Sequence, residues 1–202
     1  MKKYILYVVL GGFFMFSSVT PAFALGETGT TVVYRVTHTT PAGTLSTYAS
    51  YRIVAHEKHG YWLQRTITLT PESAPLSVTQ TLFDDFTHEP LRYIMHRPAK
   101  MGRPENVIDL PLSKMGKDEI LPVPGGKPGA NSTPLQTDIG VFETREVVID
   151  GTQFWLSLQI PVLGVVKAAT EEWTMEVVRI SQGAEDLLPK KPPQGGIVYL
   201  NN

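Results

Sequence analysis

Residues 31–70, TVVYRVTHTTPAGTLSTYASYRIVAHEKHGYWLQRTITLT, decide the fold. Apolar and polar side chains alternate in three runs, 31–39, 45–55 and 61–70, and a period of two is typical of β-strands with one buried face. Short polar links separate the runs, and Gly60 in the second link is expected to adopt the positive φ of a hairpin turn. The stretch therefore predicts three strands in an antiparallel meander.

The same alternation recurs further along the chain. It predicts strands at 90–97, 141–149, 153–160, 163–169 and 173–180, with Asp150-Gly151 as a hairpin turn. Residues 77–86 fit a strand or a short helix. The expected fold is mainly β: a single curved antiparallel sheet, an open or half-closed β-barrel, with eight to ten strands and zero to two short helices.

Residues 1–24 have the layout of a secretory signal peptide. Two lysines precede an uncharged run at 4–16, and Ala22 and Ala24 form an A-x-A cleavage site. The uncharged run is too short to span a bilayer, so we expect a mature chain without a transmembrane segment. The chain has no cysteine, which excludes disulfides, thiol catalysis and a lipidated cysteine. These features favour a periplasmic or secreted bacterial protein.

The mature chain is expected to be one β domain, 25–181, followed by a loose Pro- and Gly-rich tail, 182–202. Within the domain, a Pro- and Gly-rich insertion at about 98–138 is too long for a hairpin turn and is predicted to be a flap or a mobile loop. Residues 197–200 could dock on the domain as a short strand.

The motifs argue against an enzyme. The chain contains no Gly-x-Ser-x-Gly elbow, no P-loop and no dinucleotide fingerprint, so no catalytic residue, cofactor or metal is predicted. His56 and His59 lack the helical spacing of a zinc site, and Asp84 and Asp85 are interpreted as a solvated turn. The net charge of −1 and the lack of a basic stripe argue against nucleic-acid binding.

Part of the chain resembles a known group of proteins. The pattern consists of GVFET at 140–144, Trp155, IPVLGVVK at 160–167, WTMEVVRI at 173–180 and the opening TVVYRVT at 31–37. It resembles uncharacterised exported bacterial proteins that look like relatives of the LolA-like and LppX-like half-barrel lipoprotein carriers. The resemblance implies an incomplete β-barrel whose apolar concave face shelters an acyl chain.

The predicted function is therefore to bind or carry an apolar ligand, such as a lipid or an acyl chain, in the cell envelope. The residues proposed to form the ligand face are Tyr34, Tyr51, Leu63, Ile67, Phe154, Leu156 and Leu158. The alternative is a non-catalytic envelope protein that docks a protein partner through its strand edges and its Pro-rich tail.

Four further side chains carry expectations of their own. Trp62 and Trp155 are expected to point outward, because their positions alternate with those of Leu63 and Leu156. Arg65 and Arg145 interrupt otherwise apolar faces. Each should pair with an internal acid such as Glu143 or Glu176, or with a polar head group of a ligand.

Overall fold

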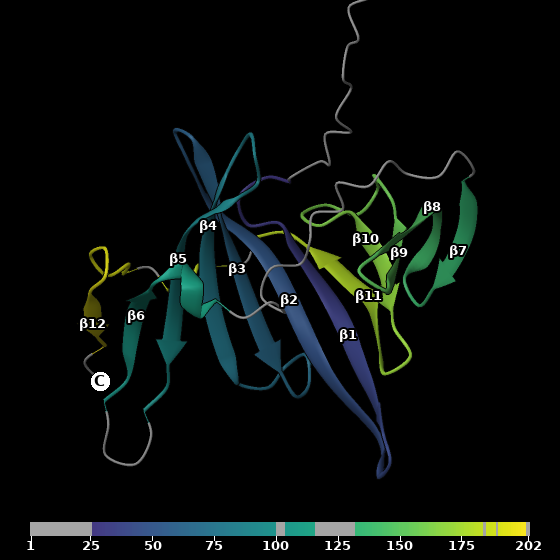
Figure 1. Cartoon of the computed structure of the whole chain (residues 1–202), viewed down its shortest axis with the longest axis horizontal. Helices are drawn as coiled ribbons and strands as arrows, with labels where there is room; N and C mark the ends of the chain where they lie inside the picture. The colour runs from purple at the N-terminus through teal and green to yellow at the C-terminus, as the bar shows by residue number, and fades with distance from the viewer. Residues whose placement is uncertain (1–25, 100–103, 116–131, 184, 189, 201–202) are drawn as a thin grey trace, which may run out of the picture.

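The computed structural model describes residues 26–99, 104–115, 132–183, 185–188 and 190–200. They form one antiparallel sheet of twelve strands that does not close on itself (Figure 1), which confirms the predicted fold class. The predicted signal peptide, with Ala22 and Ala24, lies outside the described residues. So do residues 100–103 and 116–131 of the predicted insertion.

The sheet consists of two meanders joined along one seam. The first contains β1 (Thr31–Thr40), β2 (Gly43–Glu57), β3 (Gly60–Thr68), β4 (Ser77–Asp84), β5 (Pro90–Arg97) and β6 (Asn106–Leu110). The second contains β7 (Thr133–Thr137), β8 (Gly140–Ile149), β9 (Thr152–Leu156), β10 (Val165–Ala169) and β11 (Trp173–Ser181). β1 pairs with β11 at the seam, and β12 (Ile197–Tyr199) pairs with β6 at one edge.

Several element predictions need correction. Residues 77–86, left open between strand and helix, form the strand β4, and the strand expected at 153–160 ends at Leu156. The predicted insertion contains two short strands, β6 and β7, and the 3-10 turn Leu112–Lys114. Prolines around these strands obscured them. β7 tolerates Pro134 because it is an edge strand, where a missing N–H need not break the ladder.

Two hairpin predictions had different outcomes. Asp150 and Gly151 have φ values of 49° and 79°, as a primed hairpin turn requires. Gly60, in contrast, is not among the described residues with positive φ, so that prediction is wrong. A Cβ at Gly60 would collide with the carbonyl oxygen of Phe83 on β4, so glycine is needed there for close approach of two backbones.

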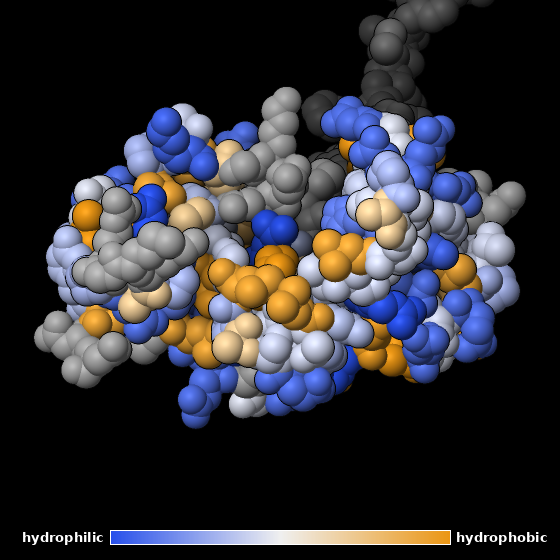
Figure 2. Space-filling view, turned by 90° about the horizontal axis from the view of Figure 1, so that it is seen from below, coloured by the Kyte–Doolittle hydropathy of each residue, from blue (hydrophilic) through white to orange (hydrophobic). Residues whose placement is uncertain are grey.

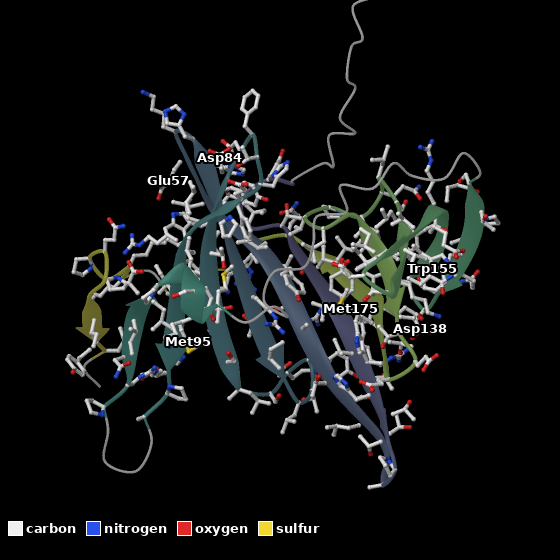
Figure 3. All side chains as sticks on the ribbon, viewed as in Figure 1. Glu57, Asp84, Met95, Asp138, Trp155 and Met175 are labelled. Atoms are coloured by element: carbon white, nitrogen blue, oxygen red, sulfur yellow. The ribbon has the colours of Figure 1, made fainter. Side chains whose placement is uncertain are left out.

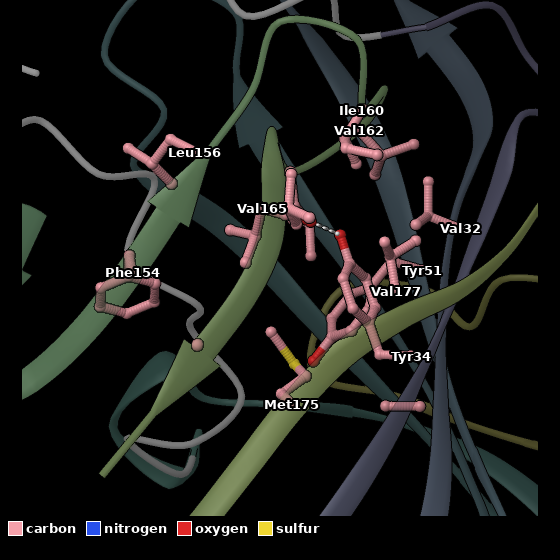
Figure 4. Packing of buried hydrophobic residues seen from close by; sticks show 14 of the residues in the cluster. Val32, Tyr34, Tyr51, Phe154, Leu156, Ile160, Val162, Val165, Met175 and Val177 are labelled. Atoms are coloured by element: carbon pink, nitrogen blue, oxygen red, sulfur yellow. Dashed lines mark hydrogen bonds between the residues drawn. The ribbon is translucent and has the colours of Figure 1, made fainter. Parts of the chain in front are cut away.

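The main core lies on one side of the sheet, which we call the inner face. Its central contacts join β1, β2 and β10 (Figure 4). The buried hydroxyl of Tyr34 donates a hydrogen bond to the carbonyl oxygen of Val165 at 2.9 Å, and its ring packs edge-on against Tyr51 at 5.8 Å. Burial raises the pKa of Tyr34 well above its usual value. This end of the inner face is a closed core.

The opposite side, which we call the outer face, has its own core under the C-terminal segment. Leu188 packs there against Trp62, Val78, Ile94 and Val107. Trp62 faces away from the main core, as predicted, but it is only 1% exposed because the C-terminal segment covers it.

Polar contacts hold the same segment to the sheet. Arg52 donates to the carbonyl oxygen of Glu185, and Arg92 donates to that of Pro192. The Lys191 ammonium lies 5.0 Å from the centre of the Trp62 ring. Within the described residues, the tail predicted to be loose therefore packs on the outer face through Leu188, Lys191 and Pro192. The prediction of a docking strand near 197–200 is confirmed by β12.

The part of the chain that the structure describes contains no helix long and apolar enough to cross a bilayer.

Candidate functional site on the inner face

Four of the residues predicted to form a ligand face are core residues instead. Tyr34, Tyr51, Phe154 and Leu156 are all buried in the main core. The side chains of Ile160, Val162 and Leu163, from the loop after β9, are buried in the same cluster. This part of the inner face is thus filled by the protein itself.

Leu158 does not belong to the predicted face. It is 66% exposed and lies in the loop after β9. The chain turns there, and the Ser157 N–H donates to the Gly164 carbonyl oxygen at 2.8 Å. The alternation that placed Leu158 on the face therefore stops two residues earlier, at Leu156.

The remaining predicted residues, Leu63 and Ile67, mark a different part of the inner face. Both lie on β3, pack against the main core and stay partly exposed. Met95 on β5 is also partly exposed. The register places it directly across from Thr79 of β4, which is only 4% exposed. Partly exposed apolar side chains therefore lie on β3 and on β5, on either side of a buried position of β4, and we call this part of the inner face the half-covered area.

Arg65 lies between Leu63 and Ile67 on the same face of β3. In the sheet register it is directly opposite Tyr51 of β2 and Thr79 of β4. Its side chain is half-buried, and its Nε atom is buried without a hydrogen-bond partner. No carboxylate among the described residues forms an ion pair with it. The predicted internal acid partner is therefore absent from this part of the chain.

The other side chains with predicted orientations or partners, Arg145, Glu143, Glu176 and Trp155, lie away from Arg65. Arg145 lies across from the core residue Leu156 in the sheet register, but its side chain is exposed and therefore needs no internal partner. Glu176 lies 3.9 Å from Lys167, and Glu143 accepts a hydrogen bond from Ser132. Trp155 alternates with the core residues Phe154 and Leu156 and so faces outward, as predicted; it is half-buried, with the Lys167 ammonium 5.5 Å from its ring centre.

An apolar rim borders the half-covered area. Leu45, Leu69 and Leu76 are 56%, 53% and 52% exposed. Leu45 lies on β2 and shares the alternation of the inner-face residues Ala49 and Tyr51. Leu69 and Leu76 lie at the two ends of the loop between β3 and β4, where the Leu76 N–H donates to the carbonyl oxygen of Ile67 at 2.8 Å. Seen from below, hydrophobic side chains gather in the middle of the molecule, between two lobes (Figure 2). The alternation in the sequence places Leu45 and Leu69 on this face, although the predicted ligand face does not include them.

A separate pocket of about 320 Å³ is lined by both apolar and charged residues. Arg35 and Asp138 form an ion pair across it at 3.2 Å. The pocket is lined by Val33, Arg35, Tyr48, Pro71, Glu72, Asp138, Ile139, Val178 and Arg179. Charged side chains of both signs make this pocket unsuitable for an acyl chain.

The acidic turn at Asp84 has a structural role (Figure 3). Its carboxylate accepts hydrogen bonds from the backbone N–H groups of Thr87 and Phe86 at 2.8 Å each, and these bonds lower the pKa of Asp84. Burial, with a smaller effect of Asp85, raises the pKa of the nearby Tyr61 to about 12. Among the described residues, no group of three or more histidine and acidic side chains is arranged to hold a metal ion.

Comparison with known proteins gives one structural likeness. No protein-family model matches the chain, and no curated protein matches it significantly. Among solved structures, a protein of Bacteroides fragilis NCTC 9343, described as exported and with a YmcC-like fold, is 11% identical over 79% of this chain and 99% of its own. The TM-score is 0.40.

Proposed function

We propose that this protein is a non-catalytic binding protein that holds an apolar ligand on the inner face of β2–β5. The observation that supports this most directly is the group Leu63, Ile67 and Met95, which stays half-covered beside a filled core. Burying exposed apolar surface of this kind lowers the free energy by about 25 cal/mol for each Å² removed from water. A ligand that covers the group and its leucine rim would gain that free energy.

Carriage in the cell envelope is part of the same proposal. It rests on the signal peptide predicted at residues 1–24 and on the resemblance to half-barrel carriers. Sequencing the amino terminus of the protein recovered from the periplasm or the medium tests the location: a mature chain that begins after Ala24 is expected. A chain that keeps its first residues and stays in the cytoplasm would remove this part of the proposal.

The partner-docking alternative has less support. It needs a free Pro-rich tail, whereas Leu188 and Pro192 are buried against the outer face. The alternative is then supported only by β7 and β12, the two edge strands of the sheet, which could pair with a strand of a partner. We therefore favour the ligand-binding function.

The test is dye binding and native mass spectrometry on the mature protein purified without detergent. A hydrophobic fluorescent dye should bind the wild type, and Ile67→Glu should abolish binding because it places a charge in the half-covered area. Val148→Glu is the matched control, since Val148 is an exposed strand residue on β8, and it should bind like the wild type. Equal binding by all three proteins, or none by the wild type, would exclude the proposed site.

A further inference from the structure

Arg65 differs from the other arginines that are partly buried in the described part of the chain. Arg35 pairs with Asp138, and Arg92 pairs with Asp109. Arg52 donates to a threonine hydroxyl and a backbone carbonyl. Arg65 has no such acceptor within the described residues, although its Nε atom is buried.

An unpaired cation on an apolar face is unfavourable unless an anion joins it. We infer that Arg65 selects the ligand: the protein binds an acidic amphiphile, with the anionic head group on the Arg65 guanidinium and the apolar chain along β3. This inference rests on the proposed function and specifies the class of molecule that the inner face takes.

The surroundings of Arg65 suit an anionic head group. A guanidinium presents a planar fork of N–H donors that matches the two oxygens of a carboxylate or a phosphate. Thr79, directly opposite on β4, contributes a hydroxyl donor in a buried position. Leu63 and Ile67 flank the arginine on β3, and low polarity strengthens an ion pair between the guanidinium and a bound anion.

The apolar chain has one open direction along the strand. Toward Gly60, the inner face is closed by Tyr61 stacked on Phe83, with ring centres 5.6 Å apart and both side chains buried. Toward the other end lie Ile67 and then the exposed Leu69. Leu69 is four positions after Arg65 and one residue past the end of β3, and four strand positions span about 13 Å. The distance from Arg65 to the exposed Leu69 therefore matches the length of a medium-length acyl chain.

The experiment measures binding of dodecanoate and its uncharged counterpart dodecanol. Short-chain phosphatidylglycerol and phosphatidylcholine are further probes that distinguish a carboxylate from a phospholipid source. Isothermal titration on the mature protein should show that an acidic probe binds at least about tenfold more tightly than its uncharged or zwitterionic counterpart. Arg65→Met should remove that preference and still bind dodecanol, while Arg65→Lys should keep part of it. Arg145→Met, which removes an exposed strand arginine, should behave like the wild type.

The outcomes separate the two claims. Binding of dodecanol as tight as that of dodecanoate would overturn the role of Arg65 and leave the proposed function standing. No binding of any probe would overturn both. A thermal unfolding scan without ligand adds an independent check: Arg65→Met should be as stable as the wild type or more so. A clear loss of stability would show that Arg65 has a counterion inside the protein, which would overturn the inference.

Discussion

Replacing Leu188 by alanine tests whether the C-terminal segment is part of the folded core. Leu188 is 2% exposed and packs against Trp62 on the outer face, whereas its neighbour Leu187 is 45% exposed. Removing a buried leucine side chain typically destabilises a protein by about 2–5 kcal/mol. We expect about 2–3 kcal/mol for Leu188→Ala, because an irregular segment can move inward and fill part of the cavity.

Leu187→Ala is the matched control, since it deletes the same atoms one residue earlier in the chain. It should change the unfolding free energy by less than about 0.5 kcal/mol. Urea unfolding of the mature protein, followed by tryptophan fluorescence, measures both variants. Trp62 reports on the site directly, so Leu188→Ala should also shift its native emission toward that of a more exposed indole.

Two results would refute the reasoning. Equal effects of the two alanines would mean that the segment does not bury Leu188 in preference to Leu187. A large effect on the denaturant slope m without a change in the midpoint would indicate a change in the compactness of the native or denatured state, rather than a lost contact in the native protein.

Three further predictions concern single contacts. Arg92→Met should destabilise the protein by about 3 kcal/mol because it leaves the buried carboxylate of Asp109 unpaired, and adding Asp109→Asn should restore much of that loss in a double-mutant cycle; additive effects would contradict the pairing. Tyr61 holds its proton to about pH 12 in the native state but ionises near pH 10 when unfolded, so stability should fall as pH rises through this range. In alkaline urea titrations the fall should be about 2 kcal/mol larger for wild type than for Tyr61→Phe, and parallel curves would argue against it. Gly60→Ala should cost about 1–3 kcal/mol, because the new methyl group collides with the backbone of Phe83; a Tm unchanged in calorimetry would show that the strands can separate freely.

The sheet could be predicted from the sequence because its strands follow a simple period. Alternation of apolar and polar residues identified β1, β2 and β3 and the faces of most of their side chains. Leu158 shows the limit of this reasoning. The alternation continues past Leu156 in the sequence, but the chain turns there, and hydrogen bonds within the turn, such as Ser157 N–H to Gly164 C=O, end the strand.

The outer-face core was missed although the sequence contained a signal for it. Tyr61-Trp62-Leu63 and Tyr93-Ile94 are consecutive apolar residues on strands, and such runs are typical of strands that are buried on both faces. The covering segment itself has no period, because it is rich in proline and crosses the sheet as irregular chain. Its position depends on contacts between residues far apart in sequence, such as Gln64 and Leu187, and local patterns do not encode these.

The position of β1 in the middle of the sheet determines when the sheet can be completed. One neighbour, β2, follows β1 immediately, whereas the other, β11, ends at Ser181. A chain that is made or exported with its amino terminus first can therefore assemble β1–β6 before β11 is available. During that time the N–H and C=O groups on one edge of β1 are unpaired. That edge, TVVYRV at 31–36, is rich in β-branched residues and is a template for pairing with another chain. The interval before β11 arrives is thus the period in which aggregation competes with folding, and a chaperone that shields β1 would act on it.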